Sequence, residues 1–401
     1  MRNRLGRLIK RRTAPTSPLD VLVRPSGNRD IYVVSGGAKR RIPSMDAFKA
    51  LGYDLKRVRV VPAHVLAGIP DAGEGNGQAG GQNLVADPYV QFTRVTPSSP
   101  LQSAEVTDVL YSRLSDSDVD RVKSSLDESQ AAALHGASVR DQKRSIISFA
   151  VHYGLTDVLG KVGLNAAIPP DDIHAMSRGV LAIAGGCLYG DLVLDAMGLD
   201  TSVLRAGAKL LDFGCSSGRV VRVLAAAYPD SGWYGCDPNQ DTIRWDRENL
   251  PGMQFAVSSG DPPLAMYSDG MFDVVFAISI WSHFAENAAV RWLNEMHRLV
   301  RPGGLLIITT HGYRSIAYLA ENRLHDPLTL AEIRDSLYSR GFCFAPIFGK
   351  AGDWGYVHQE WGEAFLSPEW LLAHVHPAWT VTKFEIGRVE NNQDIYTLQR
   401  V

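Results

Sequence analysis

One stretch constrains the fold of this chain more than any other: LLDFGCSSG, from Leu210 to Gly218. Its apolar residues predict a buried strand over Lys209–Phe213, and Gly214 lets the backbone turn sharply after it. The residues that follow place apolar side chains at helical spacing and predict a helix over Arg219–Tyr228. Together these elements predict a nucleotide cradle, because the free amide N–H groups at a helix N-terminus point at the ligand.

The residues around this turn narrow the class of ligand. A second predicted strand, Trp233–Cys236, ends at Asp237, where an acid can accept hydrogen bonds from both ribose hydroxyls. The turn lacks the three-glycine pattern that brings a dinucleotide pyrophosphate onto the helix. It carries Asp212 instead, and a carboxylate suits a ligand that ends in a cationic amino acid group.

Alternating β and α runs predict an α/β fold with a parallel sheet that is covered by helices on both faces. The expected parallel strands are Lys209–Phe213, Trp233–Cys236, Gln254–Val257, Val274–Ser279 and Leu305–Thr310. Two further strands, Thr380–Ile386 and Ile395–Gln399, are separated by the short segment ENNQD. So short a connection predicts an antiparallel hairpin at the end of the sheet.

Five motifs in this order resemble the class I S-adenosylmethionine-dependent methyltransferases, over roughly residues 168–401. Besides the glycine turn and Asp237, they are GDPP at residues 260–263, FDVVFAISIWSHF at 272–284 and LVRPGGLLIITTHG at 299–312. The resemblance implies a Rossmann-like seven-stranded sheet with an antiparallel last strand and S-adenosylmethionine as cofactor. It also implies cofactor contacts from the methionine end to the adenine amino group, the latter through Asp261. The expected cofactor-binding residues are Asp212, Gly214, Cys215, Ser216, Gly218, Asp237, Pro238, Asp261 and Ser279.

The turn departs from the family pattern at Cys215 and Ser217, which replace residues that are often glycine or alanine. Asn239 stands where many relatives carry a second acid. The alternative is therefore a fold that has lost its cofactor, although the chain keeps all three acids of the motifs.

A methyl acceptor with a hydroxyl group benefits from a histidine base near the cofactor. His283 and His311 both follow predicted strands at the edge where the ligand would bind, and His358 is a third candidate. Each could instead be a structural histidine that bonds a loop carbonyl. The spacing of His, Asp, Glu and Cys residues shows no metal-ligand pattern, so no metal is expected.

A long insertion, at about residues 313–366, is the expected source of substrate specificity. Its expected substrate-binding residues are Tyr313, Trp354, Tyr356, Glu360 and Trp361. Aromatic faces with interleaved carboxylates suit a sugar ring, which predicts O-methylation of a saccharide or glycan precursor. The alternatives are an amphipathic hairpin that only packs on the domain, a small-metabolite O- or N-methyltransferase, and a non-catalytic scaffold of a glycan-assembly complex.

Composition shifts predict five regions. They are a basic tail (1–18), a small β-rich module (19–70), a glycine-rich linker (71–102), a helical lid or N-terminal extension (103–200) and the methyltransferase-like domain (201–401) with its insertion. The module, with the sequence GGAKRRIPS, resembles a short repeat-like module of varied bacterial proteins. Its expected role is packing, with docking or glycan contact as the alternative.

The net charge of −2 argues against a nucleic-acid partner, which usually requires a strongly basic domain. Four scattered cysteines favour reduced thiols and a cytoplasmic location. The basic tail is expected to be solvated and frayed, with a weak membrane-surface contact as the alternative. The sequence leaves the oligomeric state open.

Overall fold

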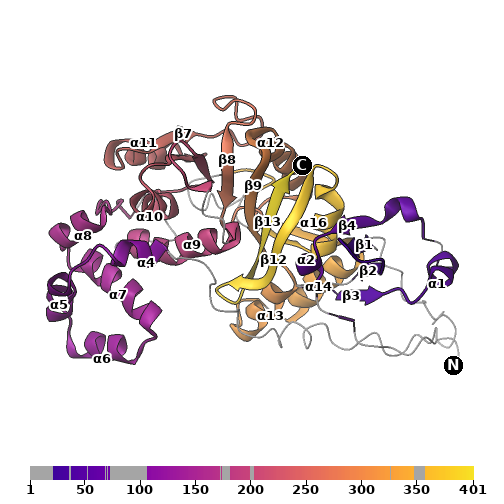
Figure 1. Ribbon diagram of the computed structural model, residues 1–401, viewed down its shortest axis with the longest axis horizontal. Coiled ribbons are helices and arrows are strands. Elements are labelled where there is room, and N and C mark those ends of the chain that lie inside the picture. Colours follow the sequence, from indigo (N-terminus) through magenta and orange to yellow (C-terminus); the bar gives the residue numbers. More distant parts are fainter. Residues whose placement is uncertain are drawn as a thin grey trace, which may run out of the picture.

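The computed structural model describes residues 21–35, 38–51, 53–67, 69, 71–72, 106–171, 173, 181–198, 203–325, 327–346 and 357–401. The predicted basic tail and nearly all of the predicted linker lie outside these residues. Figure 1 shows the described parts in a row, with the N-terminal module (indigo) on one side of the central sheet and a helical segment (magenta) on the other.

A seven-stranded sheet forms the centre of the molecule, in the order β12-β13-β9-β8-β5-β6-β7. The strands from β9 to β7 are parallel, whereas β13 is antiparallel to both of its neighbours. Their bounds are β5 Lys209–Phe213, β6 Gly232–Asp237, β7 Gln254–Val257, β8 Phe272–Ala277, β9 Val300–Thr310, β12 Trp379–Val389 and β13 Gln393–Arg400. The predicted fold class, with its antiparallel hairpin at the end of the sheet, is confirmed.

Helices cover both faces of this sheet. Successive side chains of a strand point to opposite faces, so the buried strands contribute apolar residues to two core layers. Leu210 and Val274 belong to the core layer that α9, α10 and α11 cover. Their neighbours Leu211 and Val275 belong to the opposite layer, which α12 covers. The bounds are α9 Leu181–Met197, α10 Arg219–Ala227, α11 Gln240–Asn249 and α12 Glu286–Leu299.

The helical segment before the sheet packs on α9 and α10, away from the N-terminal module (Figure 1). It consists of α4 Val106–Tyr111, α5 Asp116–Ser124, α6 Glu128–Gly136, α7 Val139–His152 and α8 Thr156–Val162. The fully buried Asp191 of α9 joins three helices, since it accepts hydrogen bonds from Thr107 Oγ1 at 2.7 Å and Arg144 Nη2 at 2.9 Å. Among the described residues, no helix is both long and apolar enough to cross a membrane.

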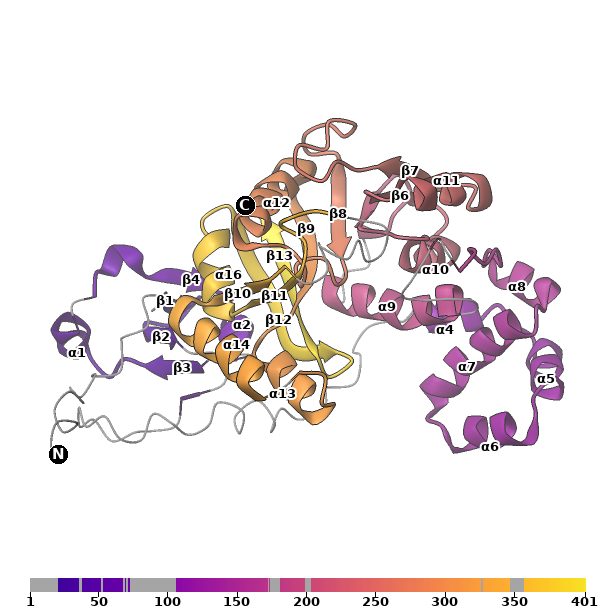
Figure 2. The same ribbon diagram turned by 180° about the vertical axis from the view of Figure 1, so that it is seen from behind.

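The N-terminal module is a four-stranded sheet in the order β3-β2-β1-β4 with two short helices. Its elements are β1 Val21–Pro25, β2 Tyr32–Ser35, β3 Ala38–Arg41, α1 Met45–Ala50, β4 Arg59–Val61 and α2 Ala63–Ala67. Buried Val23, Val34 and Ile69 belong to the same hydrophobic cluster as the α12 face of the large sheet. The module therefore packs on the large domain, beside β12 and α16 (Pro368–Val375), as both views show (Figures 1 and 2).

The insertion after β9 adds two helices and a two-stranded antiparallel sheet, β10-β11. The elements are α13 Tyr313–Glu321, α14 Pro327–Arg340, β10 Phe342–Ala345 and β11 Glu363–Leu366. Tyr313 is buried in a separate apolar cluster with Leu337 and Phe365. Backbone hydrogen bonds join the end of β11 to the strand-end loops, from Ala364 N to Ser282 O and from Leu366 N to His311 O.

A close crossing of α9 and α10 makes Gly186 a sensitive position. An added Cβ would lie 2.2 Å from the backbone oxygen of Arg219, which cannot move without moving α10. We expect Gly186→Ala to lower the free energy of unfolding by at least about 2 kcal/mol, measured by urea denaturation. Gly160→Ala is the control, because its Cβ would meet nothing within 4 Å and the change should gain up to about 1 kcal/mol. Equal effects of the two changes would contradict this packing.

Candidate active site

A pocket opens where the carboxyl ends of β5, β6 and β8 meet, the edge at which open α/β sheets bind ligands. Its free space is about 1210 Å³, a figure that includes the part open to solvent. Seven of the nine expected cofactor-binding residues line it: Asp212, Gly214, Cys215, Ser216, Asp237, Pro238 and Ser279. Gly218 and Asp261 lie outside the lining.

The glycine turn depends on left-handed backbone at three positions. Gly214 has φ +81°, Ser216 has φ 45° and Gly218 has φ 66°. At Gly214 an added Cβ would also lie 2.2 Å from the Cδ1 atom of Ile280, which lines the pocket too. Gly218 is the N-cap residue of α10, so it aims the helix N-terminus at the pocket although it does not line the wall.

Asp237 joins the two loops that form the pocket floor. One carboxylate oxygen accepts a hydrogen bond from Ser216 N at 3.0 Å, and the other accepts one from Asn239 N at 2.9 Å. Burial raises the pKa of Asp237, and these two N–H donors oppose the shift. Asn239, a departure from the family pattern, caps α11 through its side chain, which accepts hydrogen bonds from Asp241 N and Thr242 N.

Asp212 is the group in the pocket that most requires a ligand. Its side chain is 3% exposed, and its Oδ2 atom has no hydrogen-bond partner among the described residues. Burial raises the pKa of Asp212 to about 8, against the opposing effects of the Val221 backbone N–H and the Arg219 charge. A cation bound beside Asp212 would restore its ionised form, because an opposite charge favours the carboxylate.

Among the pocket residues that were not expected from the sequence, two carry polar groups that reach the pocket from helices. Tyr189 reaches the pocket from α9, and Arg219 reaches it from the first turn of α10. The guanidinium carbon of Arg219 lies 4.5 Å from the centre of the Tyr189 ring, and Tyr189 Oη donates a hydrogen bond to Glu390 at 2.7 Å. The only sequence signal for Arg219 is its place directly after the last glycine of the turn, where a side chain borders the ligand.

Of the three candidate bases, only His283 lines the pocket. Its Nδ1 atom lies 2.7 Å from the carbonyl oxygen of Gly362, which can only accept, so this nitrogen carries the proton. The lone pair of the neutral ring is therefore on Nε2. Burial lowers the pKa of His283 to about 4, which keeps the ring neutral at physiological pH.

His311 lies behind His283 and not in the pocket lining, and the centres of the two rings are 6.5 Å apart. Burial lowers the pKa of His311 to about 3, and the nearby His283 adds to the effect. Its Nε2 atom lies 3.4 Å from Gln393 Nε2, and Gln393 Oε1 accepts hydrogen bonds from Ser279 and Thr309 hydroxyls. His311 is thus connected to the pocket loop at Ser279 but does not line the pocket.

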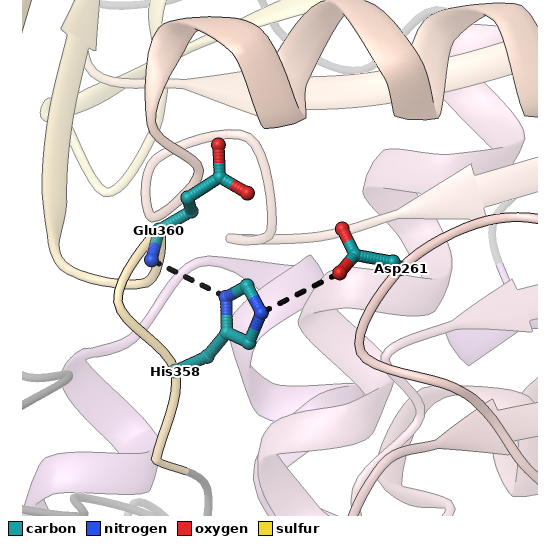
Figure 3. A group of neighbouring side chains, drawn as sticks. All are labelled: Asp261, His358 and Glu360. Carbon is teal, nitrogen blue, oxygen red and sulfur yellow. Dashed lines mark hydrogen bonds and ion pairs between the residues drawn. The ribbon is translucent and has the colours of Figure 1, made fainter.

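The third candidate, His358, belongs to an ionic cluster with Asp261 and Glu360 at the edge of the pocket. Figure 3 shows His358 between the two, with Nδ1 accepting from Glu360 N at 3.2 Å and Nε2 lying 3.7 Å from Asp261 Oδ2. Arg291 of α12 completes the cluster by donating to Asp261 at 2.7 Å and to Glu360 at 2.5 Å. These two carboxylates raise the pKa of Arg291.

Sequence spacing gave no sign of this cluster, since its members come from separate loops and from α12. The ligand atoms of Asp261, His358 and Glu360 lie within 4.8 Å of one another, as a metal site requires. However, a metal ion would have to compete with the guanidinium of Arg291 for both carboxylates. The cluster acts as an anchor that ties the segment before β11 to the loop after β7, and Asp261 stays outside the pocket wall.

The described members of the expected substrate-binding set do not all face the pocket. Trp361 lines the pocket, Glu360 pairs with Arg291, and Tyr313 is buried below the insertion. Trp354 and Tyr356 lie outside the described residues. Cys215 lines the pocket, but burial raises the pKa of its thiol well above the usual value, so it is no thiolate nucleophile.

Comparisons with known proteins find similarity over part of this domain. Residues 210–304, from β5 to the start of β9, match the family model described as a methyltransferase domain. This segment includes the glycine turn, Asp237 and His283, which all contribute to the pocket. The seven-stranded sheet and this match agree with the resemblance to class I methyltransferases.

Individual relatives share only part of the chain. A trans-aconitate 2-methyltransferase of Rhodopseudomonas palustris is 27% identical over 41% of this chain and 66% of its own length. A 2-methyl-6-phytyl-1,4-hydroquinone methyltransferase of Synechocystis is 31% identical over 29% of this chain and 36% of its own length. A solved S-adenosylmethionine-dependent methyltransferase of Methanosarcina mazei is 18% identical, with a TM-score of 0.37 over 50% of this chain and 95% of its own. The chain thus spans about a third to two thirds of the curated relatives it matches.

Proposed function

We propose that this chain is an S-adenosylmethionine-dependent methyltransferase that acts on a hydroxyl oxygen. The observation that carries the proposal is the buried, partly unpartnered carboxylate of Asp212 in the wall of the pocket at the strand ends. A ligand with a cationic end matches this carboxylate, and a ribose matches Asp237. The match to a methyltransferase domain supports the same conclusion.

The opposite charges of the pocket fit the amino acid end of this cofactor. Asp212 offers a negative group, whereas Arg219 and the N-terminus of α10 offer positive ones. An amino acid carries an ammonium and a carboxylate on one carbon, so each of its charges finds an opposite charge here. When bound, the cofactor supplies a sulfonium methyl group that an acceptor lone pair can attack in line.

The residues of the chain then have separate tasks. The glycine turn and Asp237 fix the nucleoside, and the wall formed by Phe284, Trp292 and Trp361 excludes water. His283 accepts the proton of the acceptor hydroxyl at Nε2, while Gly362 holds its other nitrogen protonated. Alignment of the two reactants is the largest contribution available, up to about 7–11 kcal/mol in ideal cases.

Two acceptor classes remain candidates, a saccharide and a smaller hydroxylated metabolite. The saccharide was expected from the aromatic and acidic residues of the insertion. Its support is weaker in the structure, because Glu360 is paired with Arg291 and Tyr313 is buried elsewhere. The relatives are named for varied acceptors, among them trans-aconitate and a hydroquinone.

Thermal unfolding with S-adenosylhomocysteine tests the cofactor assignment. At a hundred times the Kd, this ligand should add about 2.7 kcal/mol to the free energy of unfolding. Asp237→Ala should abolish the stabilisation, because it removes the ribose acceptor and the link between the two pocket loops. The control is Asp241→Ala, an exposed acid of α11 outside the pocket, which should keep the full effect. Stabilisation that survives in Asp237→Ala would refute the assignment.

His283→Gln should leave S-adenosylhomocysteine binding intact and lower turnover by about 100-fold or more. The glutamine keeps a donor toward Gly362 but offers no basic nitrogen to the acceptor. Because the pKa of His283 is about 4, turnover of the wild type should not fall through this group until the pH approaches 4. Unchanged turnover in the variant, measured with radiolabelled methyl donor, would remove His283 from the mechanism.

A further inference from the structure

An aromatic wall stands beside the lone pair of His283. The centre of the Trp361 ring lies 4.7 Å from that of the His283 ring, and the two ring planes are tilted by 31°. The Phe284 ring meets the Trp361 ring edge-on, with ring centres 5.5 Å apart. Phe284 also stacks on Trp292, with ring centres 5.8 Å apart. All four side chains line the pocket. The Trp361 ring therefore borders the position beside His283 that an acceptor hydroxyl must occupy.

This wall is held in place from outside the pocket. Glu360, the residue before Trp361, is bound by Arg291, and Gly362, the residue after it, donates a backbone hydrogen bond to His283 O at 2.8 Å. Figure 3 shows His358 and Glu360 on one loop segment, and Trp361 follows Glu360 in the sequence. An aromatic face that is fixed on both sides loses little entropy when a ring stacks against it.

Among the described residues around Trp361, few groups could receive sugar hydroxyls. Phe284, which contacts Trp361, is apolar, as are the pocket residues Ile280 and Trp292, and the carboxylate of Glu360 is already paired. A polyhydroxylated ring placed there would lose water contacts without equivalent partners, which costs free energy for each hydroxyl. A ring with one hydroxyl and apolar faces avoids that cost.

The acidity of the acceptor follows from the weakness of the base. His283 is buried, and a neighbouring sulfonium would make its protonation harder still. So weak a base accepts a proton readily only from a hydroxyl that is already acidic. A phenol ionises near pH 10, whereas an aliphatic hydroxyl resembles water, which ionises near pH 16.

We propose that the methyl acceptor is a phenolic hydroxyl, whose flat ring lies against Trp361 with its oxygen at Nε2 of His283. This inference rests on the proposed methyltransferase function and names its substrate class. The O–H proton moves to Nε2 as the oxygen lone pair forms the new O–CH3 bond. The C–S bond of the methyl donor breaks, and its electron pair returns to sulfur, which becomes a neutral thioether.

The test compares two compounds with the same carbon skeleton, 2-naphthol and decahydro-2-naphthol. Calorimetric titration of each into the protein saturated with S-adenosylhomocysteine should give 2-naphthol at least about tenfold tighter binding. Trp361→Leu should remove this preference while the Kd of S-adenosylhomocysteine stays within about threefold of wild type. With S-adenosylmethionine, 2-naphthol alone should be converted to its methyl ether.

The outcomes separate the two proposals. Failure to bind S-adenosylhomocysteine would refute the proposed function itself. Binding of S-adenosylhomocysteine together with equal or weaker binding of 2-naphthol than of its saturated analogue would overturn the phenol assignment only. If Trp361→Leu still bound 2-naphthol more tightly than its saturated analogue, the phenol assignment would also be overturned, because the acceptor ring would then not bind against Trp361.

Discussion

Replacing Asp212 with Asn is expected to stabilise the ligand-free protein and to weaken cofactor binding by over 100-fold. The pKa of Asp212 is about 8 in the folded protein and 3.8 in an exposed chain, so folding disfavours its ionised form. This cost is absent below about pH 4, grows as the pH rises, and is fully present above about pH 8. Asparagine has no ionised form, and it should raise the free energy of unfolding at pH 8 by about 2–5 kcal/mol.

The same substitution should weaken cofactor binding although it raises the stability of the ligand-free protein. Loss of the negative partner for a buried cationic group costs about 3 kcal/mol or more, which weakens S-adenosylmethionine binding by over 100-fold. Chemical denaturation at pH 5 and pH 8, combined with calorimetric titration, measures both effects. A variant that is less stable at pH 8, or that binds as well as the wild type, would contradict the role assigned to Asp212.

Asp246 provides a matched control for this experiment. Burial raises its pKa to about 9, and both of its carboxylate oxygens lack a hydrogen-bond partner among the described residues. It lies on α11 but does not line the pocket. Asp246→Asn should therefore stabilise the ligand-free protein in the same pH range and leave the affinity for the cofactor unchanged.

Replacing Gly214 with Val is expected to abolish cofactor binding in a protein that still folds. The φ of +81° disfavours any β-branched residue, and the new side chain would meet Ile280 inside the pocket. The Ile280 side chain can shift, so the added volume displaces the ligand more than it disrupts the sheet. We expect a loss of about 2 kcal/mol in stability and no detectable S-adenosylhomocysteine binding by calorimetry.

A substitution at Gly252 serves as the control, because it separates the cost of positive φ for a valine from the loss of space in the pocket. It has φ +87°, and an added Cβ would meet nothing within 4 Å. Gly252→Val should therefore show a similar loss of stability with normal binding. If Gly214→Val bound the ligand as tightly as Gly252→Val, the pocket would not be the cofactor site.

The sheet was predictable because its strands show a regular pattern of apolar residues and are bounded by turns that contain glycine. Lys209–Phe213 and Gln254–Val257 have the predicted bounds, since turn residues follow both strands. The extra length of β12 was not predictable: it continues to Val389 past Gly387, and its pairing with β13 is irregular between Glu385 and Val389. Bulged pairing of this kind depends on tertiary contacts rather than on local pattern.

The pocket was predictable where one continuous motif forms it, and less so where distant segments meet. The turn from Asp212 to Ser216 and the strand end at Asp237 follow from local sequence. Tyr189 reaches the pocket only because Gly186 allows α9 to approach α10, a contact that no local pattern encodes. The anchor formed by Arg291 and Glu360 likewise depends on how the insertion folds back on α12.

Titration calorimetry of the purified protein with S-adenosylmethionine at pH 7, in two buffers of different ionisation enthalpy, tests the central claim most directly. We expect one site of micromolar Kd and release of about one proton, because a bound cation ionises Asp212. No binding by a folded sample would contradict it and would favour a methyltransferase-like scaffold without a cofactor.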